Sequence, residues 1–257
     1  MWKKTMLIFD FDGVLFNTLD EVSLTAYNAV TGKLFISLEE LPGDLVGLFR
    51  RNRFHFQSAG DALPLMSWCI KNFRRRSHEL LSQEEYGDII DNAGISLPRR
   101  TEIFFAARKR FVERNEERWR ALNIPYQPLW DELIHRGGSR VVILTNKNRK
   151  AVLDLCRSHD LEVLEENIYS GDRGVKKIEN LNQIRRRSNG FQYCIIDDSL
   201  KNLREIDCHF QREKEKLILL FAAWGYIGPE DESKAKALGY PSFSQRDLID
   251  ILDAELI

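Results

Sequence analysis

The chain has 257 residues, of which 43% are hydrophobic and 30% are charged. This length fits one or two domains, and the composition excludes a chain that is disordered throughout. Lys and Arg number 38 and Asp and Glu 39, so the balanced charge gives no reason to expect a nucleic acid or an anionic membrane as partner.

Thiols and apolar runs give the expected compartment. The four cysteines Cys69, Cys156, Cys194 and Cys208 are far apart and form no C-x-x-C pair, so we expect reduced thiols that act as small apolar core residues. The apolar run before Asp10 is too short for a secretory leader. The longest apolar run, Leu217–Trp224, is too short to span a membrane as a helix. We therefore expect a cytoplasmic protein.

The first element is a predicted buried strand at Met6–Phe9, and a helical segment follows it. From residue 17 to about 135 the apolar residues recur mostly at helical spacing. The clearest predicted helices are Leu63–Leu81, Gln83–Ala93 and Arg99–Leu122. Asp61 and Ser82 are expected to cap the first two.

After residue 139 short apolar strands alternate with helices. The predicted strands are Val141–Leu144, the weaker Asn167–Ser170, Tyr193–Ile196 and Leu217–Phe221. The predicted helices between them are Arg149–Arg157, Ile178–Arg187 and Leu200–Ile206. This alternation favours an α/β fold with a parallel sheet. We expect residues 1–16 and 136–257 to form that α/β part, with the helical segment 17–135 inserted.

Two acids follow the first strand, in the sequence LIFDFDGV of Leu7–Val14. Ligands of open parallel sheets bind beyond the carboxyl ends of the strands. Of Asp10 and Asp12, one carboxylate could attack phosphorus and the other could transfer a proton, and together they could attract Mg²⁺. The alternative is a pair of acids that merely caps a loop.

Polar residues also follow three later strands, in positions where they could surround a phosphate. They are Thr145 and Asn146, Lys176 and Lys177, and Asp197 and Asp198. Singly, each pair has an ordinary explanation, either as a helix cap or as a solvated charge run. Together, on one edge of a sheet, they favour a site.

These segments resemble the haloacid dehalogenase-like hydrolase superfamily, in its phosphoglycolate-phosphatase-like branch. LIFDFDGV, VILTN and CIIDDSLKN are similar to motifs of that family and occur in its order. The resemblance implies a Rossmann-like parallel sheet core with an inserted α-helical cap. It also implies Asp10 as nucleophile, Asp12 as general acid and base, Thr145 as a phosphoryl ligand, and Lys177 or Lys176 as the motif lysine. The helical spacing to Leu181 and Ile184 favours Lys177.

The resemblance further implies Mg²⁺ as cofactor. Asp10, the backbone carbonyl of Asp12, and Asp198 would hold it, with Asp197 and Asn202 as further candidates. The candidates for substrate binding are Asn146, Lys176 and, from a basic cluster in the cap, Arg53 and His55. That cluster could equally be a solvated face.

The expected activity is Mg²⁺-dependent hydrolysis of a small phosphorylated metabolite through an aspartyl-phosphate on Asp10. A phosphosugar mutase and a catalytically silent binding protein of the same fold remain alternatives. A dehalogenase is disfavoured, because those relatives lack an acid at the position of Asp12. Asn17 and Ile178 depart from the residues common in the branch, which leaves the substrate open. The oligomeric state is open too.

Overall fold

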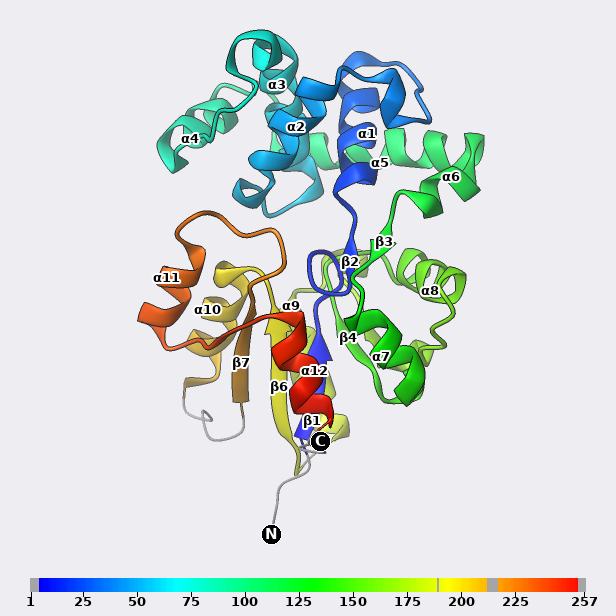
Figure 1. The fold of residues 1–257 in the computed structure, drawn as a ribbon, viewed down its shortest axis with the longest axis vertical. Coiled ribbons are helices and arrows are strands. Elements are labelled where there is room, and N and C mark those ends of the chain that lie inside the picture. Colours follow the sequence, from blue (N-terminus) through cyan, green and yellow to red (C-terminus); the bar gives the residue numbers. More distant parts are fainter. Residues whose placement is uncertain (1–4, 189, 212–216, 254–257) are drawn as a thin grey trace. The chain divides into compact units, whose positions relative to one another are not determined.

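A computed structural model describes residues 5–188, 190–211 and 217–253. The chain forms two compact units (Figure 1). The core unit contains the chain up to Asn17 and from Pro125 onward, and the helical unit contains Thr18–Ile124.

The core unit is built on a six-stranded parallel sheet. In spatial order the strands are β5 (Ile168–Tyr169), β4 (Val142–Leu144), β1 (Thr5–Phe9), β6 (Gln192–Asp197), β7 (Leu217–Ala222) and β8 (Ser242–Phe243). Ile8 of β1 is in register with Val142 on one side and Ile195 on the other. The first strand is therefore central, and the expected α/β fold with a parallel sheet is confirmed. The strand β8 was not expected.

In the described part of the core unit, six α-helices accompany this sheet. They are α7 (Leu129–Arg136), α8 (Arg149–Ser158), α9 (Lys177–Arg187), α10 (Leu200–His209), α11 (Asp231–Leu238) and α12 (Gln245–Asp253). Leu181 of α9 and Leu203 of α10 join Ile8 of the sheet in one buried hydrophobic cluster. Helices α7 and α12 pack against each other. Short 3-10 turns lie at Gly138–Arg140, Glu165–Asn167 and Asp172–Gly174.

The helical unit has its own core. Its helices are α1 (Leu19–Thr31), α2 (Gly43–Arg51), α3 (Ala62–Arg76), α4 (Gln83–Asp91), α5 (Leu97–Arg114) and α6 (Glu116–Ala121). Short 3-10 turns lie at Leu38–Glu40, Arg53–His55 and Ala59–Asp61. Fully buried residues from four of the helices fill its interior: Leu24, Phe49, Leu65, Phe104 and Phe111. The two connecting segments, β2 (Phe16–Asn17) and β3 (Ile124–Pro125), pair as a two-stranded sheet.

Three predicted features of the helical segment were wrong in detail. The single helix expected over Arg99–Leu122 is two helices, because the Asn115 side chain accepts a hydrogen bond from the backbone N–H of Arg118 and so begins α6. The helix expected to reach Leu81 ends at Arg76. Asp61 stands at the N-cap position of α3, as expected, but its side chain makes no capping bond to that helix. Ser82 does cap α4, with a reciprocal bond from Glu85.

Helix α7 belongs to the core unit, although the sequence grouped it with the inserted helices. Helix α7 buries Leu129, Trp130 and Leu133, and these residues tie it to the core unit. The Trp130 ring contacts the ring of Phe16 edge-on, with centroids 4.8 Å apart. The helical unit therefore ends before the residue at which the sequence pattern placed its boundary.

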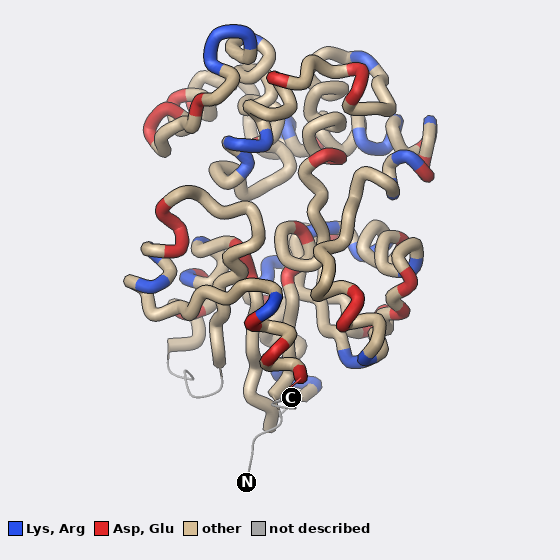
Figure 2. Tube along the Cα trace, viewed as in Figure 1, with Lys and Arg blue, Asp and Glu red and all other residues tan. Residues whose placement is uncertain are grey.

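Charges and thiols complete the description. Acidic and basic positions are interspersed over both units (Figure 2). Three cysteines are buried as expected, but the expectation was wrong for Cys208, which is exposed on α10. Within the described residues, no helix has the length and apolar character needed to cross a membrane.

Candidate active site

Asp10 stands at the carboxyl end of the central strand. Its backbone N–H donates to the carbonyl of Ile196 at 2.9 Å, which continues the β1–β6 pairing. One carboxylate oxygen accepts the N–H of Phe11 at 2.8 Å. The side chain is 11% exposed. The strand therefore delivers a fixed and nearly buried carboxylate to the edge of the sheet.

Two more acids and a lysine meet Asp10 there. Carboxylate oxygens of Asp10, Asp197 and Asp198 lie within 4.8 Å of one another. Lys177 Nζ is 3.0 Å from Asp10 Oδ2 and 2.6 Å from Asp197 Oδ2. In the part of the chain that the structure describes, Lys177 thus contacts two of the three carboxylates, those of Asp10 and Asp197.

Burial and the neighbouring charges shift the pKa values of Asp10 and Lys177. Burial raises the pKa of Asp10 to about 8, against a lowering by Lys177 and with further raising by Asp197 and Asp198. Burial lowers the pKa of Lys177, but the attraction of Asp10 and Asp197 outweighs it and leaves that pKa above its ordinary value. The lysine is therefore charged, and the acids favour a further cation.

Residues that directly follow β6 hold the Asp197 carboxylate in place. Its Oδ1 accepts the backbone N–H of Ser199 at 2.9 Å, and both of its oxygens lie 3.1 Å from the side-chain nitrogen of Asn202. The sequence placed Asn202 among candidate metal ligands. The Asn202 amide N–H groups donate to Asp197, so in this structure Asn202 orients the Asp197 carboxylate.

Two glycines allow other loops to approach Asp198. A Cβ on Gly13, which has φ +92°, would lie 2.1 Å from Asp198 Oδ2. A Cβ on Gly225 would lie 2.3 Å from Asp198 Cβ and 2.6 Å from the carbonyl oxygen of Gly13. The next residue, Tyr226, donates its backbone N–H to Asp198 Oδ2 at 2.7 Å. The loop after β7 is therefore part of the wall of the site.

The loop after β4 supplies the expected hydroxyl and an unexpected lysine. Thr145 is buried and its Oγ1 accepts the backbone N–H of Lys147 at 3.1 Å. Asn146 is exposed. Lys147 Nζ is 3.0 Å from Oδ1 of Asp12. Asp12 therefore pairs with a lysine, and its side chain is outside the group of three acids.

The remaining candidates have other surroundings, each within its own unit. Lys176 is exposed, whereas its neighbour Lys177 is buried among the carboxylates. In the helical unit, the guanidinium of Arg53 lies 4.0 Å from the Phe56 ring centre. The His55 ring stacks on Tyr86, and its Nε2 is 2.8 Å from the carbonyl of Leu81. Both side chains thus have contacts within that unit.

Sequence reasoning missed three site residues. Lys147 directly follows Thr145 and Asn146, so its position at a strand end was a usable signal. Gly225 and Tyr226 follow the apolar run of β7, and their role depends on a close approach that no local pattern reveals.

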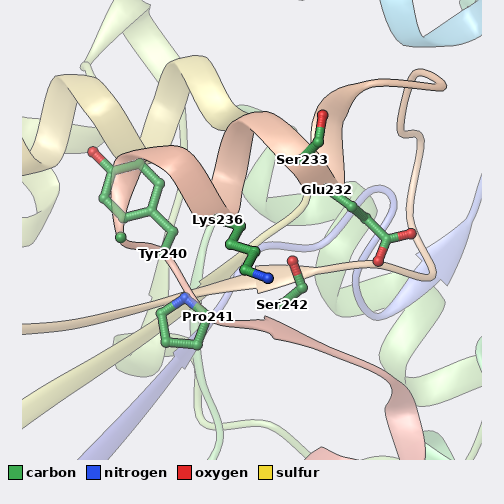
Figure 3. A pocket seen from close by; sticks show the side chains of 7 residues that line it. Glu232, Ser233, Lys236, Tyr240, Pro241 and Ser242 are labelled. Carbon is green, nitrogen blue, oxygen red and sulfur yellow. The ribbon is translucent and has the colours of Figure 1, made fainter.

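The core unit also contains an open depression of about 570 Å³ at β8 and α11 (Figure 3). Its lining residues are Glu232, Ser233, Lys236, Gly239, Tyr240, Pro241 and Ser242. None of these belongs to the acidic group, so the depression and the candidate site are distinct.

Comparisons with known proteins place this architecture. No family model matches the sequence, and no curated protein matches it. Solved structures do match. A haloacid dehalogenase-like family hydrolase from Streptococcus pneumoniae superimposes with a TM-score of 0.55 at 14% identity, over 98% of this chain and 100% of that one.

Two other solved structures agree with it. A predicted phosphoglycolate phosphatase from Haemophilus somnus gives a TM-score of 0.55 at 15% identity, with 97% of this chain and 98% of that one covered. A haloacid dehalogenase family hydrolase from Deinococcus radiodurans, solved with bound phosphate and sodium, gives a TM-score of 0.51 at 16% identity. The match covers 100% of this chain and 97% of that one. The chain has the fold of the haloacid dehalogenase-like hydrolases, as its sequence motifs predicted.

Proposed function

We propose that the protein is a Mg²⁺-dependent phosphomonoester hydrolase that acts through an aspartyl-phosphate on Asp10. The observation that carries the proposal is the placement of Asp10 beside Asp197, Asp198 and a charged lysine at the end of the central strand. The likeness in fold to a predicted phosphoglycolate phosphatase and to a hydrolase solved with bound phosphate supports it.

The donor set fits magnesium. Mg²⁺ binds carboxylate oxygens and retains several waters, and the three acids have one lysine to balance them. Asp10, Asp198 and the backbone carbonyl of Asp12 would hold the ion, with Asp197 beside them. Bound there, the ion would offset the negative charge of the carboxylates and of the phosphoryl oxygens.

The covalent step belongs to Asp10. A carboxylate oxygen of Asp10 attacks phosphorus, and the bond from phosphorus to the leaving oxygen breaks. Asp12 gives its proton to that oxygen, which departs as an alcohol. Asp12 then takes a proton from water as the water oxygen attacks phosphorus. The bond from Asp10 to phosphorus breaks, and inorganic phosphate leaves.

The neighbouring residues position the phosphoryl group. Lys177 would neutralise its oxygens and favour the ionised form of Asp10, since the ammonium already lies 3.0 Å from that carboxylate and lowers its pKa against the effect of burial. Thr145 would donate its hydroxyl to a phosphoryl oxygen, and exposed Asn146 would contact the same group from the same loop. This chemistry depends mainly on positioning and electrostatics. The substrate class we propose is a small phosphorylated metabolite.

The test is hydrolysis of an aryl phosphate and of a panel of phosphorylated metabolites, with Mg²⁺ and with a chelator. We expect turnover that requires Mg²⁺ and is lost in Asp10→Asn. Asp231→Asn is the matched control, because Asp231 lies in α11 of the same unit, outside the acidic group. If the whole panel is inert and Mg²⁺ does not bind, the protein is not this hydrolase, and a silent binding protein becomes the better description.

A further inference from the structure

Asp12 has a buried basic partner that the proposed chemistry has not yet used. Lys147 Nζ lies 3.0 Å from Asp12 Oδ1. The lysine side chain is 4% exposed, and that of Asp12 is 28% exposed. Because water reaches the pair mainly from the carboxylate side, the attraction is less screened than in a surface ion pair.

Lys147 is itself held in place. Its backbone N–H donates to Thr145 Oγ1 at 3.1 Å. Its Nζ lies 5.8 Å from the centre of the Phe11 ring, and Phe11 is buried and stacked on Phe16 with centroids 4.6 Å apart. A side chain fixed at both ends loses little further freedom when it contacts a carboxylate, so the contact can define the position of its partner.

The two buried lysines of the site face different acids. Lys177 contacts Asp10 and Asp197, whereas Lys147 contacts Asp12. In the proposed function, on which this inference rests, Asp10 forms the bond to phosphorus and Asp12 transfers protons. The two ammonium groups therefore serve separate parts of the reaction.

We propose that Lys147 is a positioning residue that holds the Asp12 carboxylate for its proton transfers. The ammonium holds Oδ1 at hydrogen-bond distance and so limits the orientations that the carboxylate can adopt. Proton transfer requires hydrogen-bond geometry to the leaving oxygen and later to water, and small displacements of a reacting group are costly in rate. Lys147 acts through Asp12 and makes no bond to phosphorus.

Leaving-group dependence tests this role. Lys147→Met keeps an unbranched side chain of similar length but removes the positive charge. An alkyl phosphate needs protonation of its leaving oxygen, whereas 4-nitrophenol leaves readily as an anion. We expect kcat/KM of Lys147→Met, which reports the step in which the leaving group departs, to fall at least about tenfold further on the alkyl phosphate than on 4-nitrophenyl phosphate, a part of what general acid catalysis contributes. Lys147→Arg should recover part of the loss.

Lys150→Met is the matched control, because Lys150 is exposed on the adjacent helix α8, and it should behave like the wild type. An equal loss of kcat/KM on both substrates would overturn the proposal. So would a change confined to KM, because it would mean that Lys147 binds the substrate phosphate.

A double variant separates action through Asp12 from direct action. Adding Lys147→Met to Asp12→Asn should slow 4-nitrophenyl phosphate hydrolysis no further than Asp12→Asn alone. An added loss as large as the one in the wild-type background would overturn the proposal.

A crystal structure of Lys147→Met beside the wild type gives a readout that needs no turnover. We expect the Asp12 carboxylate to move or to occupy more than one conformer in the variant. An unchanged Asp12 would overturn the positioning role even in a chain without activity. An inert wild type would contradict the proposed function, and the position of Asp12 would still decide this inference.

Discussion

Asp10 combines burial, two neighbouring acids and one neighbouring lysine, and these act on its proton in opposite directions. Burial and the acids together raise its pKa to about 8 from the ordinary 3.8, despite Lys177. A cation beside the carboxylates would favour the ionised form, which is the form that attacks phosphorus. The residue is therefore suited to act with a metal bound nearby.

This pKa predicts how the stability of the metal-free protein depends on pH. Between about pH 4 and 8 the folded state keeps a proton on Asp10 that the unfolded state has lost. The contribution of Asp10 is thus fully present at about pH 4 and is lost as the pH rises through 8. We expect Tm without metal to fall over this range, less steeply in Asp10→Asn. Equal slopes for the two proteins, measured by thermal unfolding in chelator, would contradict the assignment.

Gly225 gives a second prediction at the residue scale. A methyl group there would collide with Asp198 Cβ and the carbonyl of Gly13, so Gly225→Ala should displace the acid or the loop. We expect a stability loss of about 1–3 kcal/mol and weaker Mg²⁺ binding, measured by denaturation and by calorimetric titration. Gly87→Ala on α4 is the control, because an added Cβ would meet no described atom within 4 Å beyond its chain neighbours and its own helix backbone, and the helix gains from alanine. Unchanged Mg²⁺ binding in Gly225→Ala would show that the contact is unimportant.

At the scale of elements, the sequence predicted most accurately where an apolar run stands between polar residues. All five predicted strands are present, because buried parallel strands are short and continuous in hydrophobicity. The prediction failed at Asn115, where a side-chain bond interrupts a periodic pattern that continues on both sides. Such a break depends on the local geometry of one residue, so periodicity alone does not reveal it.

Asn115 supplies the prediction for this scale. Asn115→Ala removes the bond to the N–H of Arg118 and leaves that donor of α6 without its cap. We expect a loss of about 1 kcal/mol in the free energy of unfolding, measured in urea. Ser96→Ala is the matched comparison, because Ser96 precedes α5 without a side-chain capping bond. A loss no larger than that of Ser96→Ala would mean that the cap is dispensable.

Helices α1 and α5 are joined by a buried ion pair. Glu21 is fully buried. Its two carboxylate oxygens accept hydrogen bonds from Nε and from a terminal nitrogen of Arg108, at 2.8 and 2.6 Å. Thr25 also donates to Glu21. Arg108→Met would leave a buried carboxylate without its cation, so we expect a destabilisation of about 3–5 kcal/mol in urea unfolding. Lys109→Met, at an exposed neighbouring position, should have little effect. Similar stabilities for the two variants would count against the role of the pair.

At the scale of the whole molecule, the strand ends explain how much of the site was foreseeable. Four site residues lie at the ends of strands or at the start of a helix on one edge of the sheet: Asp10, Asp197, Asp198 and Lys177. The topology of the sheet therefore brought them together. The partners Lys147 and Tyr226 depend on how separate loops approach one another. The sequence favoured Lys177 over Lys176, and in the structure Lys177 is buried at the start of α9 whereas Lys176 is exposed.

The most direct test of the central claim is a search for the phosphorylated enzyme. The protein is mixed with a turned-over phosphomonoester and Mg²⁺, quenched in acid within the first turnover, digested, and analysed by mass spectrometry. We predict one added phosphoryl group on the peptide that contains Asp10, absent in Asp10→Asn. Turnover with the phosphoryl group on another residue, or without any covalent phosphoryl-enzyme at times when product is forming, would contradict the account.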